Sequence, residues 1–175
     1  MSNKILVTYA SRGGSTAGIA QAIGKTLTES GLRVDVRPMQ EIHDLTPYTA
    51  VVAGSAIHKE KWLPEAMQFM ERHQKELAQK PFAAFLVCLA LALNYDRLRK
   101  RAEGNVADWL QPVRALVNPA NEGLFAGVLD LSKVPFVFRL LGRLGILVGL
   151  WSQGDHRDWD AIHAWANELP SNLVV

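Results

Sequence analysis

The chain has 175 residues and a mass of 19.4 kDa, which suits one domain and excludes two large ones. Its 49% hydrophobic and 21% charged residues support a packed core and exclude a disordered chain. The formal net charge of +2 is too close to balance to indicate a nucleic-acid partner. A single cysteine, Cys88, excludes an intrachain disulfide and any multi-cysteine metal site.

Apolar runs of strand length alternate with helical patterns from one end of the chain to the other. This alternation predicts an α/β fold in one domain, residues 1–175, with a doubly wound parallel sheet of five strands in the order 2-1-3-4-5. In such a sheet, ligands bind beyond the carboxyl ends of the strands, where the strand order reverses. The expected strands are residues 4–10, 33–39, 49–56, 82–92 and 123–129, and the expected helices are residues 16–30, 63–77, 96–117 and 158–169.

An additional apolar segment, residues 134–151, follows the fifth strand and is not needed by the minimal fold. Arg139 and Arg143 lie inside it, and each would cost about 2.5–3.5 kcal/mol at the centre of a bilayer, which argues against a spanning helix. The two arginines are four residues apart and share one helical face. The segment therefore predicts an amphipathic helix on a membrane, on a partner subunit or over the active site, with an extra core helix as the alternative.

A loop of small and hydroxylated residues joins the first strand to the first helix. Its glycines permit a close backbone approach to a ligand, and the N–H groups of the helix N-terminus favour an anion. The hydroxyl side chains can donate hydrogen bonds to phosphate oxygens, so the loop predicts a site for a terminal monophosphate. The alternative is an ordinary capped helix after a tight turn. The loop consists of Ser11, Arg12, Gly13, Gly14, Ser15 and Thr16.

This loop resembles the FMN phosphate loop of flavodoxins, usually written [ST]-x-[ST]-G-x-T. Gly13 departs from that pattern because it replaces the middle hydroxyl, as related loops do in the menaquinone-dependent protoporphyrinogen oxidase family. The resemblance to this second family covers nearly the whole chain. It includes the apolar segment and the stretches Gly54-Ser55-Ala56-Ile57-His58 and Phe125-Ala126-Gly127-Val128-Leu129.

The resemblance implies a flavodoxin-like fold and a bound FMN, with the flavin ring held between the loops after the third and fourth strands. We expect Trp62 and Tyr95 to sandwich the ring; the alternative for each is packing at the start of a helix. The expected ring contacts on the first loop are Ala56, Ile57, His58 and Trp62, and those on the second are Leu91, Ala92, Leu93, Asn94 and Tyr95.

The first of these loops is basic, since it reads His58-Lys59-Glu60-Lys61. Positive charge beside a flavin stabilises its anionic reduced form and raises its potential. We therefore expect the flavin potential to be less negative than that of a low-potential carrier. The alternative is that these lysines are solvated and do not affect the flavin.

The resemblance implies an FMN-dependent oxidoreductase of the protoporphyrinogen oxidase type, which passes electrons from an organic substrate through FMN to a quinone. The alternatives are a flavodoxin-type carrier for a partner reductase and an FMN protein with another substrate, and in a further possibility the apolar helix forms a homodimer. The catalytic residues are left open, because the flavin performs the redox chemistry. Neither a G-x-S-x-G motif nor a metal-ligand spacing of histidines occurs.

The first apolar run, Ile5-Leu6-Val7, is too short for the hydrophobic region of a signal peptide. We expect a cytoplasmic protein, with peripheral contact at the inner face of the membrane through residues 134–151.

Overall fold

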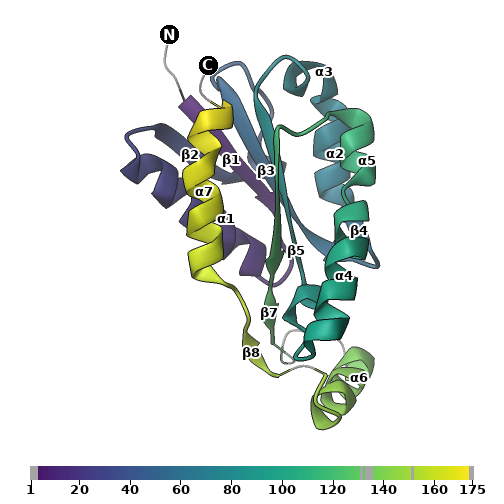
Figure 1. Cartoon of the computed structure of the whole chain (residues 1–175). Coiled ribbons are helices and arrows are strands. Elements are labelled where there is room, and N and C mark those ends of the chain that lie inside the picture. The colour runs from purple at the N-terminus through teal and green to yellow at the C-terminus, as the bar shows by residue number, and fades with distance from the viewer. Residues whose placement is uncertain (1–3, 131, 133–135, 151, 174–175) are drawn as a thin grey trace.

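The computed structural model describes residues 4–130, 132, 136–150 and 152–173. Five parallel strands form the sheet in the order β2-β1-β3-β5-β6, which confirms the predicted order 2-1-3-4-5 (Figure 1). A short strand, β4, pairs antiparallel with the end of β3 and lies off this path. The strands are β1 Lys4–Ala10, β2 Arg33–Pro38, β3 Ala50–His58, β4 Lys61–Trp62, β5 Phe82–Cys88 and β6 Asn121–Ala126.

Helices cover both faces of the sheet (Figure 1). One face is covered by α1 Ser15–Glu29 and α7 Trp159–Leu173, and the other by α2 Pro64–Arg72, α3 Gln74–Leu77, α4 Asp96–Asp108 and α5 Gln111–Leu116. Every residue of β5 is buried, and so are the first six of β3, because these central strands are covered on both sides. Each face of the sheet therefore has its own hydrophobic core.

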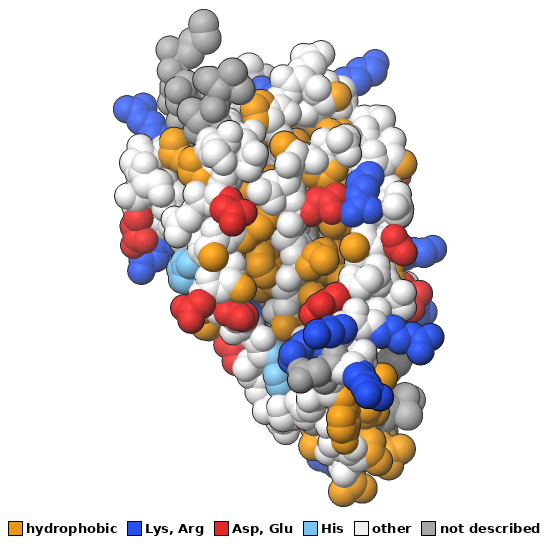
Figure 2. Space-filling model, in the orientation of Figure 1, with side chains coloured by type: hydrophobic (Ala, Val, Ile, Leu, Met, Phe, Trp, Pro, Cys, Tyr) orange, Lys and Arg blue, Asp and Glu red, His pale blue; other side chains and the backbone are white. Residues whose placement is uncertain are grey.

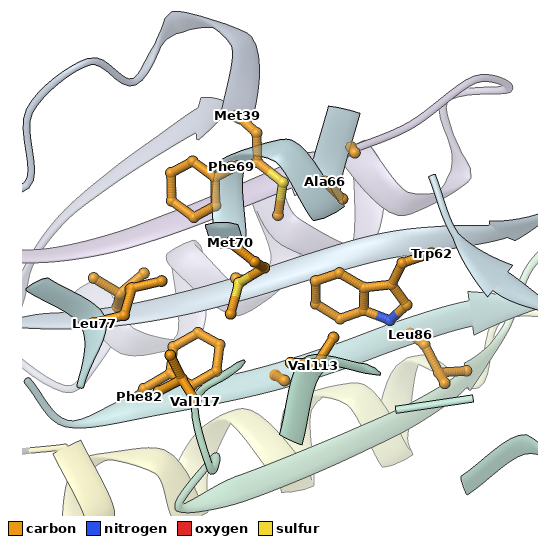
Figure 3. Close-up of a cluster of buried hydrophobic side chains, with 14 of the residues drawn as sticks. Met39, Trp62, Ala66, Phe69, Met70, Leu77, Phe82, Leu86, Val113 and Val117 are labelled. Carbon is orange, nitrogen blue, oxygen red and sulfur yellow. The ribbon is translucent and has the colours of Figure 1, made fainter. Parts of the chain in front are cut away.

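The core between the sheet and α2 and α5 is shown in Figure 3, where Met70 and Trp62 lie among apolar side chains of both helices and the sheet. On the opposite face, Phe85 packs against Phe125 and Trp165, with ring centroids 6.1 Å apart in both pairs. Gly54 faces the ring of Phe85, and a Cβ at this position would overlap it. The close approach of β3 to this aromatic cluster therefore requires a glycine.

Two of the predicted helices are each divided in two. The helix predicted over residues 63–77 stops at His73, whose ring is buried and whose Nδ1 lies 2.7 Å from the Glu76 carboxylate. The helix predicted over 96–117 is interrupted after Asp108, because Pro112 in the first turn of α5 has no backbone N–H to donate to the carbonyl four residues earlier. The last helix starts one residue later than predicted and continues to Leu173.

Four of the predicted strands have different ends. The run 82–92 is a strand only as far as Cys88, because its last four residues form the 3-10 turn η2 Leu89–Ala92. The second strand likewise ends at Pro38, where the 3-10 turn η1 Met39–Glu41 begins. The third strand extends to His58. The run 123–129 divides because β7 Val128–Leu129 leaves the sheet and pairs antiparallel with β8 Gly154–Asp155. Hydrophobic runs do not distinguish a strand from a buried turn that continues it.

The apolar segment contains α6 Phe136–Leu147, as predicted, and the helix lies beyond the carboxyl ends of the strands (Figure 1). Val134, Pro135 and Trp151 of the predicted segment lie outside the described residues. Leu144 is 58% exposed and Leu147 is 82% exposed, so the alternative of an extra core helix is wrong for this face of α6. Among the described residues, none of the helices has the length and apolarity needed to cross a bilayer.

Candidate cofactor site

The loop between β1 and α1 turns tightly into the N-terminus of α1. Gly14 precedes α1 at a φ of +88°, a conformation that disfavours other residues, and no side chain in the described part of the chain caps the helix. The Gly14 N–H donates to the Ser11 hydroxyl over 3.0 Å, which closes the loop. A Cβ at Gly13 or Gly14 would meet nothing within 4 Å, and the first turn of α1 contains no acidic residue. An anion can therefore approach the N-terminus of this helix without a steric or charge barrier.

Thr16 provides a test of whether the loop fits a phosphate. The residue is fully buried in the first turn of α1, and its Oγ1 has no hydrogen-bond partner among the described residues. A buried hydroxyl without a partner destabilises a protein by about 1–3 kcal/mol. A phosphate oxygen at this helix end would supply the missing partner, so the residues present fit the phosphate of FMN.

The surroundings of this loop include a cation and a neighbouring segment of the chain. Arg12 is exposed on the loop itself and places a cation beside the expected phosphate. The β6–β7 corner packs against the loop from the other side, because a Cβ at Gly127 would lie 3.5 Å from the Ser15 hydroxyl. The loop is thus held between the sheet and the segment that leads to α6.

Arg157 lies against the first turn of α1, although its sequence context gives no sign of this. A Cβ at Gly18 would overlap the Arg157 guanidinium, so the glycine makes room for it. Asp155 holds that guanidinium with hydrogen bonds of 2.8 Å and 2.6 Å, and the ring of Trp159 lies 4.3 Å from it. Arg157 therefore joins the β8 segment to the helix that follows the expected phosphate loop.

The loop after β3 is a hairpin, although its sequence lacks the residues that normally predict one. His58 pairs with Lys61 across a two-residue turn formed by Lys59 and Glu60, whose φ angles are 50° and 62°. Consecutive left-handed residues other than glycine cost roughly 1–2 kcal/mol each. The Ser55 hydroxyl stabilises the base of the hairpin, since it accepts from the Leu63 N–H over 3.0 Å and donates to the Ala56 carbonyl over 2.8 Å.

Trp62 does not lie where a ring-stacking residue is expected. Its side chain is only 4% exposed and packs among Ala66, Leu86 and Val113, as Figure 3 shows. The predicted stacking role is therefore corrected, because the indole ring fills the core beneath the hairpin and offers no face to a ligand. On this loop, His58 is exposed while Ala56 and Ile57 are half-buried.

The second expected ring loop connects β5 to α4 and is joined to α6. Asn94 donates from its backbone N–H to the Leu150 carbonyl over 3.0 Å and from its side chain to the Gly149 carbonyl over 3.1 Å. Tyr95 is 49% exposed, and a Cβ at Gly149 would lie 3.2 Å from its hydroxyl. Ala92 is buried, and Leu91 and Leu93 are half-buried. The loop and the end of the apolar helix thus form one structural unit.

The three expected binding segments meet at one edge of the sheet. Ala10 at the end of β1 is aligned with Ser55 of β3, and Ala56 is aligned with Val87 of β5. Residues 11–16, 56–58 and 91–95 therefore begin beside one another at the carboxyl ends of three adjacent strands. The edge includes the point between β1 and β3 where the strand order reverses, which is where open α/β sheets bind ligands.

A family model described as a flavodoxin domain matches residues 6–144 of the sequence. The chain belongs to the flavodoxin domain family. The cofactor of this family is FMN, which agrees with the unpartnered Thr16 hydroxyl and the open phosphate loop. The fold predicted from the resemblance to flavodoxins is thereby confirmed.

Solved flavodoxins resemble this flavodoxin-domain protein over almost its entire length. A Streptococcus pneumonia TIGR4 flavodoxin is 17% identical with a TM-score of 0.58, covering 97% of this chain and 99% of that one. Flavodoxin 2 from Bacillus cereus is 18% identical with a TM-score of 0.54, covering 96% and 98%. A short-chain flavodoxin associated with a bacterial microcompartment is 13% identical with a TM-score of 0.59, covering 97% of both. At these identities the likeness shows a shared fold. A search of curated proteins finds no match.

Proposed function

We propose that this flavodoxin-domain protein is an FMN-dependent oxidoreductase of the protoporphyrinogen oxidase type, which passes electrons from an organic substrate through FMN to a quinone. The observation that supports it is the exposed apolar helix α6, which Asn94 joins to the loop that would hold the flavin ring. The tetrapyrrole body of a porphyrinogen and the tail of a lipid-soluble quinone are large and apolar, and an exposed apolar surface beside the cofactor is suited to receive them.

The chain's own residues bind and orient the cofactor in this proposal. The N–H groups and hydroxyls of residues 11–16 hold the phosphate, while residues 56–58 and 91–95 border the ring. Tyr95 is the aromatic side chain offered to it, since Trp62 is buried. When bound, FMN supplies the acceptance and release of electrons.

The hairpin supports a quinone as the electron acceptor. Lys59 and Lys61 are exposed at the turn beside His58, so the hairpin carries positive charge next to the expected ring. This charge favours an anionic flavin and raises its potential. Spectroelectrochemistry measures it directly: a strongly negative flavin potential, typical of a low-potential carrier, would contradict this part of the proposal.

The proposal includes peripheral contact of α6 with a membrane, because a membrane quinone has to be reached at the bilayer. A homodimer through α6 is the competing use of the same surface. The described residues contain no helix that could span the bilayer, so contact of this kind would be made at the membrane surface.

A flavodoxin-type electron carrier is the second candidate. Its supporting observation is the exposure of both expected ring loops, since His58 to Lys61 and Asn94 to Tyr95 are open to solvent. A protein partner could reach a ring edge there. A carrier, however, has no evident use for the apolar surface of α6.

The decisive experiment purifies the protein, identifies the released yellow cofactor and follows oxidation of protoporphyrinogen with menaquinone present. The proposal expects FMN and quinone-dependent turnover. FMN without such turnover, together with rapid reduction by a flavodoxin reductase, would refute the oxidase proposal and identify a carrier. A protein that binds no FMN would contradict both candidates.

A further inference from the structure

Six exposed apolar side chains gather at one end of the molecule, from two helices. α6 and the turn after it contribute most of them, and the start of α4 adds the remainder. Figure 2 shows this apolar surface at the lower end of the molecule. The side chains, with their exposed fractions, are Leu140 63%, Leu144 58%, Leu147 82%, Val148 56%, Leu98 43% and Tyr95 49%. We refer to residues 95–101 and 139–150 as the α4–α6 tip.

Basic side chains surround this apolar surface. Residues 131–154 contain no acid, and residues 96–101 contain four bases and one acid, Asp96. Together these two stretches hold seven of the chain's 19 Lys and Arg residues and a single one of its 17 Asp and Glu residues. The rest of the chain is therefore net negative. Figure 2 shows Lys and Arg side chains directly beside the apolar end. The exposed ones on the described helices are Arg97, Lys100, Arg101 and Arg143.

We propose that the α4–α6 tip docks on an anionic lipid bilayer, with its leucines inserted among the lipid chains and its cations at the headgroups. An apolar face bordered by Lys and Arg is the arrangement that binds the surface of an anionic membrane. A second copy of the chain is the poorer occupant, because a two-fold contact would bring two basic borders together. This inference rests on the proposed function and defines its membrane partner.

The orientation of the docked protein follows from Asn94. Its two hydrogen bonds join the expected ring loop to Leu150 and Gly149 at the end of α6, and Tyr95 of that loop belongs to the exposed tip. Docking therefore places the loop that borders the flavin at the bilayer surface. A lipid-soluble quinone could then reach the cofactor from the bilayer without crossing water.

Vesicle cosedimentation of the full chain tests the docking. Binding is compared on vesicles of phosphatidylglycerol with phosphatidylcholine and on vesicles of phosphatidylcholine alone, at low and high salt. We expect binding to the anionic vesicles that weakens with salt. Replacing Arg97 and Arg101 by Gln should weaken it by about fivefold for each cation removed. Arg72 and Lys75 are exposed cations near the opposite end of the sheet, and R72Q/K75Q is the matched control, expected to bind as the parent does.

The apolar contribution is tested with L144S/L147S, which should lower vesicle affinity by more than tenfold while leaving the FMN content unchanged. Insertion is followed separately with an environment-sensitive dye on Leu147→Cys, using Lys75→Cys as the control. Native Cys88 is 7% exposed, and burial raises the pKa of its thiol, so it should react slowly. A blue shift on anionic vesicles at position 147 and none at position 75 supports the proposal.

Three outcomes would overturn the docking. They are no binding to anionic vesicles, equal loss of binding in R72Q/K75Q and R97Q/R101Q, and a salt-resistant dimer that L144S/L147S converts to a monomer. Cosedimentation needs no turnover, so failure of the oxidase assay and failure of docking are distinguished. Vesicle binding without oxidase activity would leave the membrane site in place and refute the proposed substrate.

Discussion

Removing the Thr16 hydroxyl should change stability and cofactor affinity in opposite directions. In Thr16→Val the shape is kept, but the buried hydroxyl that has no partner among the described residues is lost. The cofactor-free protein should become more stable by about 1–3 kcal/mol, the usual cost of such an unpaired group. FMN affinity should fall by about 10- to 100-fold, because a hydrogen bond to a charged phosphate contributes about 1.5–3 kcal/mol.

Urea unfolding of the cofactor-free protein gives the first quantity, and flavin titration gives the second. Thr8→Val is a matched control, since Thr8 is also fully buried, its hydroxyl has no partner in the part of the chain that the structure describes, and it lies on β1, before the loop. The control should gain stability without losing FMN. Riboflavin, which has no phosphate, should bind Thr16→Val and the parent equally. If Thr16→Val binds FMN as tightly as the parent, the hydroxyl does not contact the phosphate.

Three other changes test other parts of the structure. Gly14→Asp places a carboxylate at the anion site at a φ of +88°, so FMN binding should be lost in a titration, and full retention would refute the loop assignment. Gly54→Ala should lower the free energy of unfolding by about 1–3 kcal/mol in urea, because its Cβ overlaps the buried Phe85 ring; an unchanged midpoint would contradict this packing. Hydrogen bonding by Arg157 lowers the pKa of the Asp155 carboxyl below its ordinary 3.8. A carboxyl whose pKa is lowered in the folded protein stabilises the fold fully above its ordinary pKa, and this stabilisation is lost as the pH falls through the lowered pKa. Asp155→Asn should therefore be less stable than the parent near pH 6, and the difference in stability between the two proteins should be smaller below pH 4. If the two proteins differ in unfolding free energy by the same amount at both pH values, the Asp155 carboxylate does not stabilise the fold through Arg157.

The strand order and the glycine-rich connection between β1 and α1 were predictable because each depends on a local pattern. β3 and β5 are continuous apolar runs, as strands covered on both faces must be, and the Gly13–Gly14 pair stands where a strand gives way to a helix. The same reasoning places residues 11–16, 56–58 and 91–95 at one edge, since parallel strands share their carboxyl ends.

The hairpin and the burial of Trp62 depend on packing that no local pattern describes. Lys59 and Glu60 adopt left-handed backbone angles without the Asn or Gly that normally indicates such a turn. Trp62 follows that turn and pairs antiparallel with Ile57. In this arrangement its indole ring is packed in the core. A sequence that shows an aromatic residue after a strand cannot distinguish this arrangement from an exposed stacking residue.

The division of charge along the chain also changes how its net charge of +2 should be interpreted. Seven bases lie in two stretches that are far apart in sequence. The fold brings four of them that are exposed among the described residues, Arg97, Lys100, Arg101 and Arg143, to one end, because α4 begins where α6 ends. A molecule with a basic apolar end and a net negative remainder would be oriented by an anionic surface before contact, and salt would reduce that orientation. The nearly neutral total therefore does not describe the α4–α6 tip, where the proposed attraction to anionic lipid acts locally, at the end of the molecule where the expected flavin loop lies.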